Sequence, residues 1–263
     1  MHVLYIYTHM HIKNYKWLRG HTKKDGIHKP DGIPSTNECL YYTGFLYGGG
    51  HIISIDGNSF TFNGIGEYWL LRSPTYSLYI QVRFVQFENT RLTVASAIAV
   101  RHQGIDVQIE VRNGALNLFV GGRLQHLPTD HIVYIVTRAG VQTLSGLTVA
   151  NLDLSNMSYS NSKLFIRANG SNALFITLPS GASLRVSLQV SFLQIAIGLS
   201  TQFRSYYSYY YLYNYRYLHT RGLMGTFNGY SYDDFLLPNN STITSSSEVN
   251  THRFGLACKC ILT

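Results

Sequence analysis

The residues of this chain whose types and spacing could do chemistry lie in one stretch near its end, RGLMGTFNGYSYDDFLLP at 221–238. Five residues there offer oxygen atoms at relative positions 0, 2, 4, 7 and 8: Thr226, Asn228, Tyr230, Asp233 and Asp234. Alternate residues of a glycine-bearing loop can turn their oxygens inward around a hard cation, as EF-hand loops do with different spacing. Tyr230 would offer only its backbone carbonyl. Carboxylate, amide and carbonyl oxygens suit Ca²⁺ better than Zn²⁺.

An ordinary surface turn is the competing interpretation of this loop, because Asn-Gly and Asp are common turn residues. In either case the adjacent carboxylates of Asp233 and Asp234 need a nearby positive charge, since like charges repel. The chain holds 13 acidic residues against 21 lysines and arginines, so their adjacency does not follow from an acidic composition. Spacing alone favours the turn, and other residues must decide.

The elements that would position this loop show a period of two, which is typical of half-buried β-strands. Leu78, Ile80 and Val82 fall on one face of a segment whose other face carries Gln81 and Arg83. The same alternation recurs in three further segments, DVQIEVR, SLRVSLQV and FLQIAIGL. Helical periodicity of any length is absent, so the pattern predicts an all-β chain.

Turn signals separate these segments at spacings of roughly ten residues. Asn113-Gly114 follows one alternating segment, and Asn169-Gly170 separates KLFIRA from ALFITL. Asn-Gly is the strongest short hairpin signal, because both turn positions require a positive φ. We therefore expect an antiparallel β-sandwich in which one face of each sheet is buried.

The composition excludes several classes of protein. Of 263 residues, 45% are hydrophobic and 13% charged, which is too apolar for a disordered chain and too lightly charged for a typical cytosolic enzyme. The net charge is +8, but the basic residues are mostly single and widely spaced, so we predict no nucleic-acid partner. No run of about 18 apolar residues occurs, so no transmembrane segment is predicted.

The two ends of the chain differ from its middle. Residues 1–46 carry five of the eleven histidines with poor periodicity, and we expect a linker or poorly ordered segment there, with a His-rich metal-binding tail as the alternative. The cysteines are three, an odd number, so they cannot form a fully paired disulfide framework: Cys39, Cys258 and Cys260. Residues 258–263 are expected to be a ragged C-terminus. The N-terminus shows no signal-peptide pattern.

Four N-glycosylation sequons are compatible with an extracellular chain: Asn156, Asn169, Asn239 and Asn240. Sequons also arise by chance in a chain rich in Ser and Asn. Together with the ragged ends, they indicate a fragment of a longer secreted or membrane-anchored protein.

The stretch SYYSYYYLYNYRY at 205–217 has eight tyrosines in thirteen residues, and we expect it to be an insertion in a loop. Exposed tyrosines can also act as stacking platforms for sugars. A secreted carbohydrate-binding β-sandwich is therefore the alternative function.

An enzyme is not predicted. The histidines of the central region, His102, His126 and His131, have no nucleophile-elbow motif such as Gly-x-Ser-x-Gly beside them. Glu67 and Glu110 are isolated carboxylates on predicted strands, and nothing marks them as the pair of a glycosidase. No catalytic residue is assigned.

Two longer stretches, YGGGHIISIDGNSFTFNGIGEYWLL at 47–71 and RGLMGTFNGYSYDDFLLPNNSTI at 221–243, resemble the two ends of a von Willebrand factor type D domain. FGLA at 254–257 continues the pattern. The resemblance covers residues 47–257 and is nearest to the branch that includes mucin-4, sushi domain-containing protein 2 and insect Mesh. It implies that residues 1–46 include the end of an AMOP-like module.

The resemblance also implies a structural calcium site that connects the first strand to the last. Carried over position by position, its ligands are Asp56, Asn228, the carbonyl of Tyr230, Asp233 and Asp234. Thr226 replaces an Asn or Asp common in relatives, which implies one weaker ligand.

This sequence departs from the family in two places. Gly48-Gly49-Gly50-His51 stands where many relatives have Gly-Asp-Pro-His, so we predict no cleavage between Asp and Pro. Residues 220–225 lack the Cys-Gly-Leu-Cys-Gly signature, so disulfide-linked assembly is not expected.

The sequence thus predicts an extracellular structural or adhesion module, a calcium-stabilised type D domain of a membrane-anchored or mucin-like protein. Its expected partners are neighbouring extracellular modules or other proteins. Any membrane anchor would belong to a part of the parent protein outside this chain.

Overall fold

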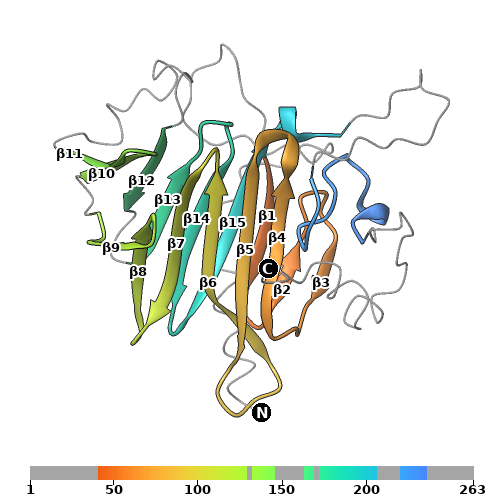
Figure 1. The fold of residues 1–263 in the computed structure, drawn as a ribbon. Coiled ribbons are helices and arrows are strands. Elements are labelled where there is room, and N and C mark those ends of the chain that lie inside the picture. Colours follow the sequence, from red (N-terminus) through yellow and green to blue (C-terminus); the bar gives the residue numbers. More distant parts are fainter. Residues whose placement is uncertain (1–40, 129–131, 146–162, 169–171, 206–219, 236–263) are drawn as a thin grey trace, which may run out of the picture.

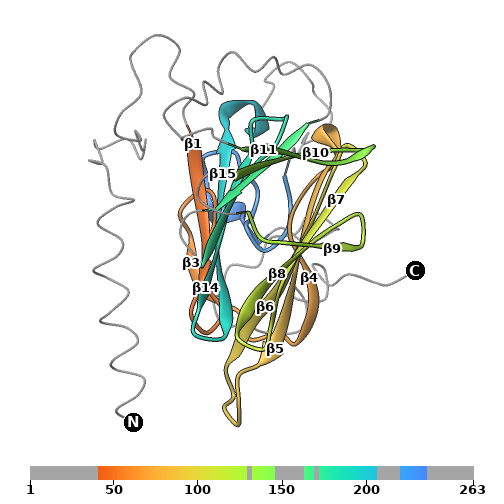
Figure 2. The same ribbon diagram turned by 90° about the vertical axis from the view of Figure 1, so that its left-hand side faces the viewer.

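Two antiparallel sheets, packed face to face, make up the part of the chain that the computed structural model describes, which is residues 41–128, 132–145, 163–168, 172–205 and 220–235 (Figures 1 and 2). In the nine-stranded sheet the strand order is β11-β10-β12-β13-β14-β15-β1-β2-β3, and in the six-stranded sheet it is β4-β5-β6-β7-β8-β9. The predicted all-β, antiparallel sandwich is therefore confirmed.

The nine-stranded sheet consists of β1 (Tyr41–Tyr47), β2 (His51–Ile53), β3 (Ser59–Thr61), β10 (Ile132–Thr137), β11 (Gly140–Ser145), β12 (Leu164–Ala168), β13 (Ala173–Thr177), β14 (Ser183–Gln189) and β15 (Phe192–Ser200). The six-stranded sheet consists of β4 (Gly66–Ser73), β5 (Leu78–Gln86), β6 (Thr93–His102), β7 (Ile105–Arg112), β8 (Ala115–Val120) and β9 (Arg123–Gln125). Three short 3-10 turns accompany them: η2 (Pro74–Tyr76), η4 (Thr201–Phe203) and η5 (Ser231–Asp233). No helix in the described ranges is long and apolar enough to cross a membrane.

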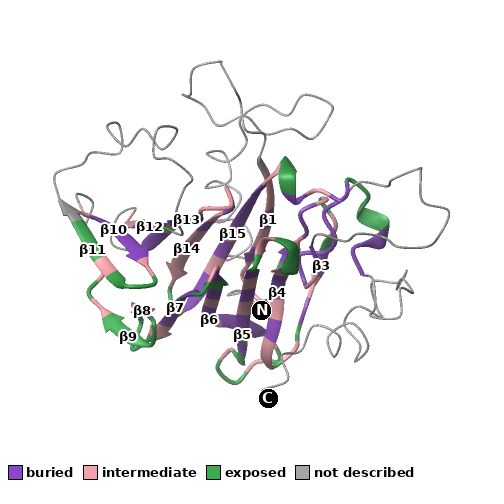
Figure 3. Cartoon of the chain, turned by 45° about the horizontal axis from the view of Figure 1, so that its top comes forward, coloured by how far each residue is buried: buried purple, intermediate pink, exposed green. Residues whose placement is uncertain are grey.

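The apolar and polar side chains that alternate in the sequence lie on the inner and outer faces of the strands, respectively. Leu78, Ile80 and Val82 of β5 are at most 1% exposed and lie in the core between the sheets, while Arg83 is exposed. Burial is concentrated in the strands and in the stretch after residue 220, whereas η2 has no buried residue (Figure 3). Since every second side chain of a strand points to the same face, burying one face requires this period.

The hairpin predicted at Asn113-Gly114 is confirmed. Both residues have positive φ, 52° and 71°, and they connect β7 to β8 with Arg112 opposite Ala115. The second Asn-Gly pair lies outside the described residues. The strands on either side of it, β12 and β13, pair antiparallel as predicted.

Strand β1 begins before the domain boundary that the sequence analysis placed after residue 46. It pairs with β15 on one side and β2 on the other, so residues 41–46 belong to an inner strand of the nine-stranded sheet. Their sequence, YYTGFL, is rich in aromatic residues that favour strands. The rest of the segment expected to be a linker, residues 1–40, lies outside the described residues.

Residues 220–235, here called the closing segment, connect the two sheets at one side of the sandwich. Arg221 forms an antiparallel bridge with Arg72, and Leu223 and Met224 donate to backbone oxygens of β4 at 2.9 Å each. On the other side, the Met224 carbonyl accepts from the backbone N–H of Ile55, just after β2, at 3.1 Å. The closing segment (blue in Figure 1) therefore hydrogen-bonds to the edge strand of one sheet and to the end of a strand in the other.

Candidate functional site in the closing segment

The side chains of four of the five residues assigned to a calcium site, Asp56, Asn228, Asp233 and Asp234, make hydrogen bonds at the closing segment. The Ser54 hydroxyl donates to Asp234 Oδ2 at 2.5 Å, across 180 residues of sequence. Asp56 Oδ2 accepts from the backbone N–H groups of Asn228 and Gly229, both at 2.9 Å. The structure thus joins the turn after β2 directly to the acidic loop.

The turn between β2 and β3 explains how Ser54 and Asp56 reach this place. The Ser54 N–H donates to the Asn58 carbonyl at 2.8 Å, and the Ser54 hydroxyl accepts from the Asn58 N–H at 2.9 Å. Gly57 provides the positive φ of 91° that the turn needs. Ser54 is fully buried in consequence, while Asp56 is half-buried and faces the backbone of the acidic loop.

Asp234 lies in a space that only glycine at position 225 leaves open. Gly225 has a φ of +79°, and a Cβ atom there would stand 2.2 Å from Asp234 Oδ1. The N–H of Thr226 donates to that same oxygen at 3.2 Å. Asp234, at the end of η5, is only 2% exposed, so its carboxyl group is held inside the protein.

Asp233 accepts hydrogen bonds from two side chains of its own loop. The Asn228 amide nitrogen donates to both of its carboxylate oxygens, at 2.8 and 3.1 Å, and the Thr226 hydroxyl donates to Oδ1 at 3.0 Å. The Asn228 amide oxygen accepts from the backbone N–H of Tyr230 at 2.7 Å. Thr226, for which the resemblance implied a weaker ligand, here supplies two donors to the acidic pair.

The electrostatics of the site oppose ionisation of Asp234. The pKa of the Asp234 carboxyl is raised to about 8, chiefly by burial and also by the charges of Asp56 and Asp233, against the lowering effect of the hydrogen bonds from Ser54 and Thr226. Burial also raises the pKa of Asp56, against the lowering effect of backbone N–H donors and of the Arg204 guanidinium. A positive charge among these carboxylates would favour their ionised forms.

The donor types at the site fit a hard cation. Three carboxylates, an amide oxygen and a backbone carbonyl are the ligands that Ca²⁺ prefers. As placed, however, the carboxylates accept hydrogen bonds from their own loop. Across the described ranges, no three His, Cys, Asp or Glu side chains converge as a group that could hold a metal. A shared cation would have to replace some of the present N–H and O–H contacts.

Sequence reasoning missed three residues that shape this site. Ser54 binds Asp234, the Thr220 hydroxyl accepts from the Phe227 N–H at 2.7 Å, and Arg204 Nε donates to the Asn228 carbonyl at 3.2 Å. The only sequence signal for Ser54 is its position two residues before Asp56. Arg204 and Thr220 flank the Tyr-rich stretch, and nothing in their sequence context indicates their contacts.

Several other residues singled out from the sequence lie outside the described part of the chain: the sequon residues Asn156, Asn169, Asn239 and Asn240, the three cysteines, His131, and all of the Tyr-rich stretch except Ser205. Their assignments stay predictions.

The remaining histidines and glutamates stand apart from the acidic site. His102 is fully buried, burial lowers its pKa to about 4, and neither ring nitrogen has a hydrogen-bond partner within the described ranges. His126 is exposed. Glu67 and Glu110 lie on the six-stranded sheet in ion pairs with Arg83 and Arg112. A histidine without polar partners is not in position to activate a nucleophile.

Comparison with known proteins finds relatives over most of the chain. Human "Sushi domain-containing protein 2" is 30% identical over 211 residues, which is 77% of this chain and 21% of that protein. "Mucin-4" of mouse and of rat are each 24% identical over 209 residues, 79% of this chain, and the match covers 5% and 8% of those proteins. The chain thus spans about a fifth or less of the length of these relatives. No family model matches it.

Proposed function

We propose that the region predicted at residues 47–257, together with strand β1 that begins at Tyr41, forms a von Willebrand factor type D domain that serves as a structural module of an extracellular protein. Similarity to Sushi domain-containing protein 2 and Mucin-4 indicates a mucin-like or adhesion-type protein. The motifs around Asp56 and Asn228 support the type D assignment, and the antiparallel sandwich is compatible with it. The module would contact neighbouring extracellular modules or other proteins.

One observation carries this proposal: Asp56 and the acidic pair, from opposite ends of the domain, meet at a largely buried junction of the two sheets. Calcium held by Asp56, Asn228, the Tyr230 carbonyl, Asp233 and Asp234 would supply the positive charge that lets all three carboxylates ionise. Extracellular modules bind calcium at about 10⁻⁴–10⁻³ M. The ion would therefore stabilise the fold mainly outside the cell.

The proposal does not include an enzymatic activity. The printed names of the relatives denote no reaction. Asp233 and Asp234 are 1% and 2% exposed and accept hydrogen bonds within their own loop. Such carboxylates are suited to holding the domain together rather than to meeting a substrate.

The test is the thermal unfolding of the full chain with millimolar calcium, with chelator, and with magnesium as a control cation. A ligand that binds only the folded state raises its stability by mass action. We expect calcium to raise the Tm of the parent chain and to have little effect on Asp56→Asn. The matched control is Asp106→Asn, because Asp106 is exposed and pairs with Arg101 away from the acidic loop. An equal calcium response in the parent and in Asp56→Asn would refute the site.

A further inference from the structure

The outer face of the six-stranded sheet is hollowed, and the proposed calcium site does not explain this hollow. It measures about 600 Å³, within the roughly 300–1,000 Å³ range of ligand sites, and strands β4 to β8 line it. Its lining side chains alternate along each strand with buried core residues such as Ile80 and Ile109. They therefore face away from the other sheet.

One row of this face runs straight across five strands. The register places side by side Trp69, Gln81, Ala99, Gln108 and Phe119. Four strand spacings put the two ends of the row roughly 19 Å apart. An aromatic side chain stands at each end of the row. A glutamine amide lies next to each of them, and the methyl group of Ala99 lies in the middle. The small alanine on β6 leaves room between the amides, which explains why the face is hollow there.

The aromatic rings of the row are partly exposed: the Trp69 ring is tilted against Tyr79, and the Arg112 guanidinium lies over one face of the Phe119 ring. The Trp69 ring stands 5.9 Å from that of Tyr79 at an angle of 57°, and the Arg112 guanidinium lies 5.3 Å from the centre of the Phe119 ring. Trp69, Tyr79 and Phe119 are each of intermediate exposure. Rings held in this way offer apolar surface with little loss of side-chain entropy on binding.

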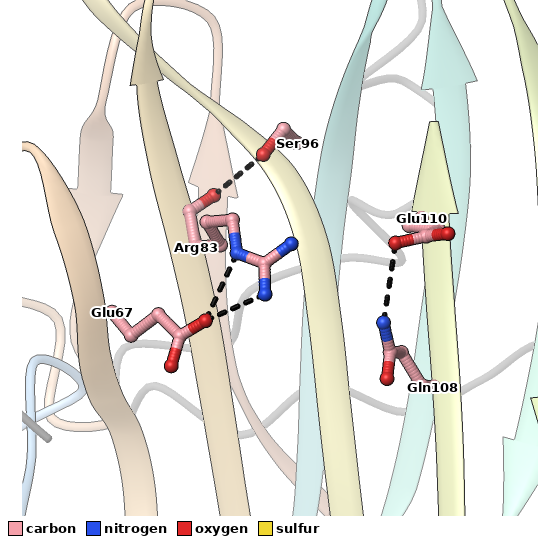
Figure 4. A network of polar contacts seen from close by, with 5 residues as sticks. All are labelled: Glu67, Arg83, Ser96, Gln108 and Glu110. Carbon is pink, nitrogen blue, oxygen red and sulfur yellow. Dashed lines mark hydrogen bonds and ion pairs between the residues drawn. The ribbon is translucent and has the colours of Figure 1, made fainter. Parts of the chain in front are cut away.

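The charges beside the row are paired within the sheet. Arg101 makes two contacts with Asp106, at 2.7 and 2.9 Å, and Arg83 makes two with Glu67, at 2.6 and 3.0 Å. In a third ion pair, Glu110 contacts Arg112, and the Glu110 carboxylate also accepts a hydrogen bond from the Gln108 amide at 3.2 Å. Figure 4 shows the Arg83 guanidinium beside Glu67 and the Gln108 amide beside Glu110. These three cations are therefore each paired with an anion, while Arg72, opposite Tyr79 on the same face, adds a further positive charge at the edge of the hollow.

We propose that this hollow binds a neutral oligosaccharide. The C–H faces of sugar rings pack against aromatic rings, and the Gln81 and Gln108 amides can both donate to and accept from hydroxyl groups. The backbone groups of β5, β6 and β7 are paired on both sides, so an extended peptide has no edge there to which it could add as a strand. Since Arg83, Arg101 and Arg112 are each already paired with a carboxylate, sulfated or sialylated chains would gain little from these three cations.

This site differs from the Tyr-rich stretch, which the sequence analysis took as the stacking surface of a carbohydrate-binding domain. The row is invisible to a search for aromatic clusters, because Trp69 and Phe119 are 50 residues apart in the sequence. Only the cross-strand register brings them into line.

The test uses the full chain and a glycan array of neutral, sialylated and sulfated oligosaccharides. The strongest neutral tetrasaccharide is then titrated in solution. The chain has two tryptophans, so Trp17→Phe leaves Trp69 as the sole tryptophan reporter of binding. Trp69→Ala and Phe119→Ala, followed by calorimetry, are each expected to weaken binding roughly tenfold or more. Phe175→Ala is the matched control, because Phe175 is a partly exposed aromatic residue of the other sheet, held by Arg167 and Arg185.

Binding of neutral sugars that both row variants weaken and the control keeps would support the site. Binding of charged glycans alone, or binding unchanged in Trp69→Ala, would overturn it. Absence of any glycan binding would also overturn it, and sedimentation would then show whether the face joins a second copy of the chain, in a dimer that Trp69→Ala dissociates. Because Asp56→Asn leaves the row untouched, failure here is distinguishable from failure of the calcium site.

Discussion

Replacing Asp234 by asparagine is expected to change the stability of the fold in opposite directions with and without calcium. The substitution keeps the shape of the side chain and removes its charge. Without calcium, the parent must either hold a proton on Asp234 or bury a carboxylate near Asp56 and Asp233. With calcium, the same carboxylate becomes a ligand, which an amide replaces poorly.

The expected change in the free energy of unfolding without calcium follows from the raised pKa of Asp234, which is about 8 in the fold against an ordinary value of 3.8. The unfolded chain releases this proton as pH rises above 3.8, whereas the fold keeps it until about pH 8, so stability falls across that window. At pH 7 the loss amounts to about 4 kcal/mol. Asparagine avoids this loss but weakens the contacts to Ser54 and Thr226, worth about 1–3 kcal/mol. The variant is therefore expected to gain about 1–3 kcal/mol in chelator.

Calcium at about a hundred times its Kd would add about 2.7 kcal/mol to the parent. Denaturant titrations of the parent and of Asp234→Asn, each with chelator and with calcium, measure both effects. At pH 3, where both states of the parent largely hold the proton, only the weakened contacts remain, and the variant is expected to be about 1–3 kcal/mol less stable than the parent. A variant that is less stable than the parent in chelator and equally responsive to calcium would refute both the strain at Asp234 and its role as a ligand.

Two further predictions concern single residues. Burial lowers the pKa of His102 to about 4 from its ordinary value of 6.5, so as pH falls the unfolded chain binds a proton before the folded chain does. The parent is therefore expected to lose about 3 kcal/mol of stability as pH falls from 6.5 to 4. Comparing His102→Leu with the parent by denaturant titration at several pH values isolates this loss, and a constant difference between the two would contradict it. Gly225→Ala is expected to cost about 2 kcal/mol or more, since a Cβ there meets Asp234 at 2.2 Å. The control Gly57→Ala, also at positive φ but with open space around it, should cost only about 1–2 kcal/mol, and equal losses would show that contact with Asp234 is unimportant.

The strands were predictable because each sheet buries one face, and burial imposes the period of two on the sequence. The partner of each strand was not predictable from that period, since pairing depends on irregularities that alternation does not reveal. The register shifts between Trp69 and Leu71, and again beside Phe84. The first shift lets the adjacent residues Leu70 and Leu71 both point into the core. These shifts decide which outward side chains form the row from Trp69 to Phe119.

The acidic site shows the same division between local and distant information. The spacing of Asn228, Asp233 and Asp234 indicated that their oxygens could converge, and the structure places all three together. Asp56 was assigned to them by resemblance alone, because spacing carries no information about a contact across about 170 residues. Ser54 was missed for that reason, although it makes a buried hydrogen bond to the site.

The closing segment also determines how the molecule would carry a pulling force. Strand β1 and the end of the closing segment lie near opposite ends of the described chain, yet Tyr42 packs on Phe227 with ring centres 4.7 Å apart, and Phe60 packs on Phe235 at 4.9 Å. Tension applied through the two ends of the domain would therefore load this junction first, together with the pairing of β1 with β15 and β2. The rest of both sheets lies within the loop of chain that the junction closes, so it would be shielded until the junction opens. In a surface protein exposed to shear, such a domain would extend little under load, and the acidic junction would set the force at which it yields.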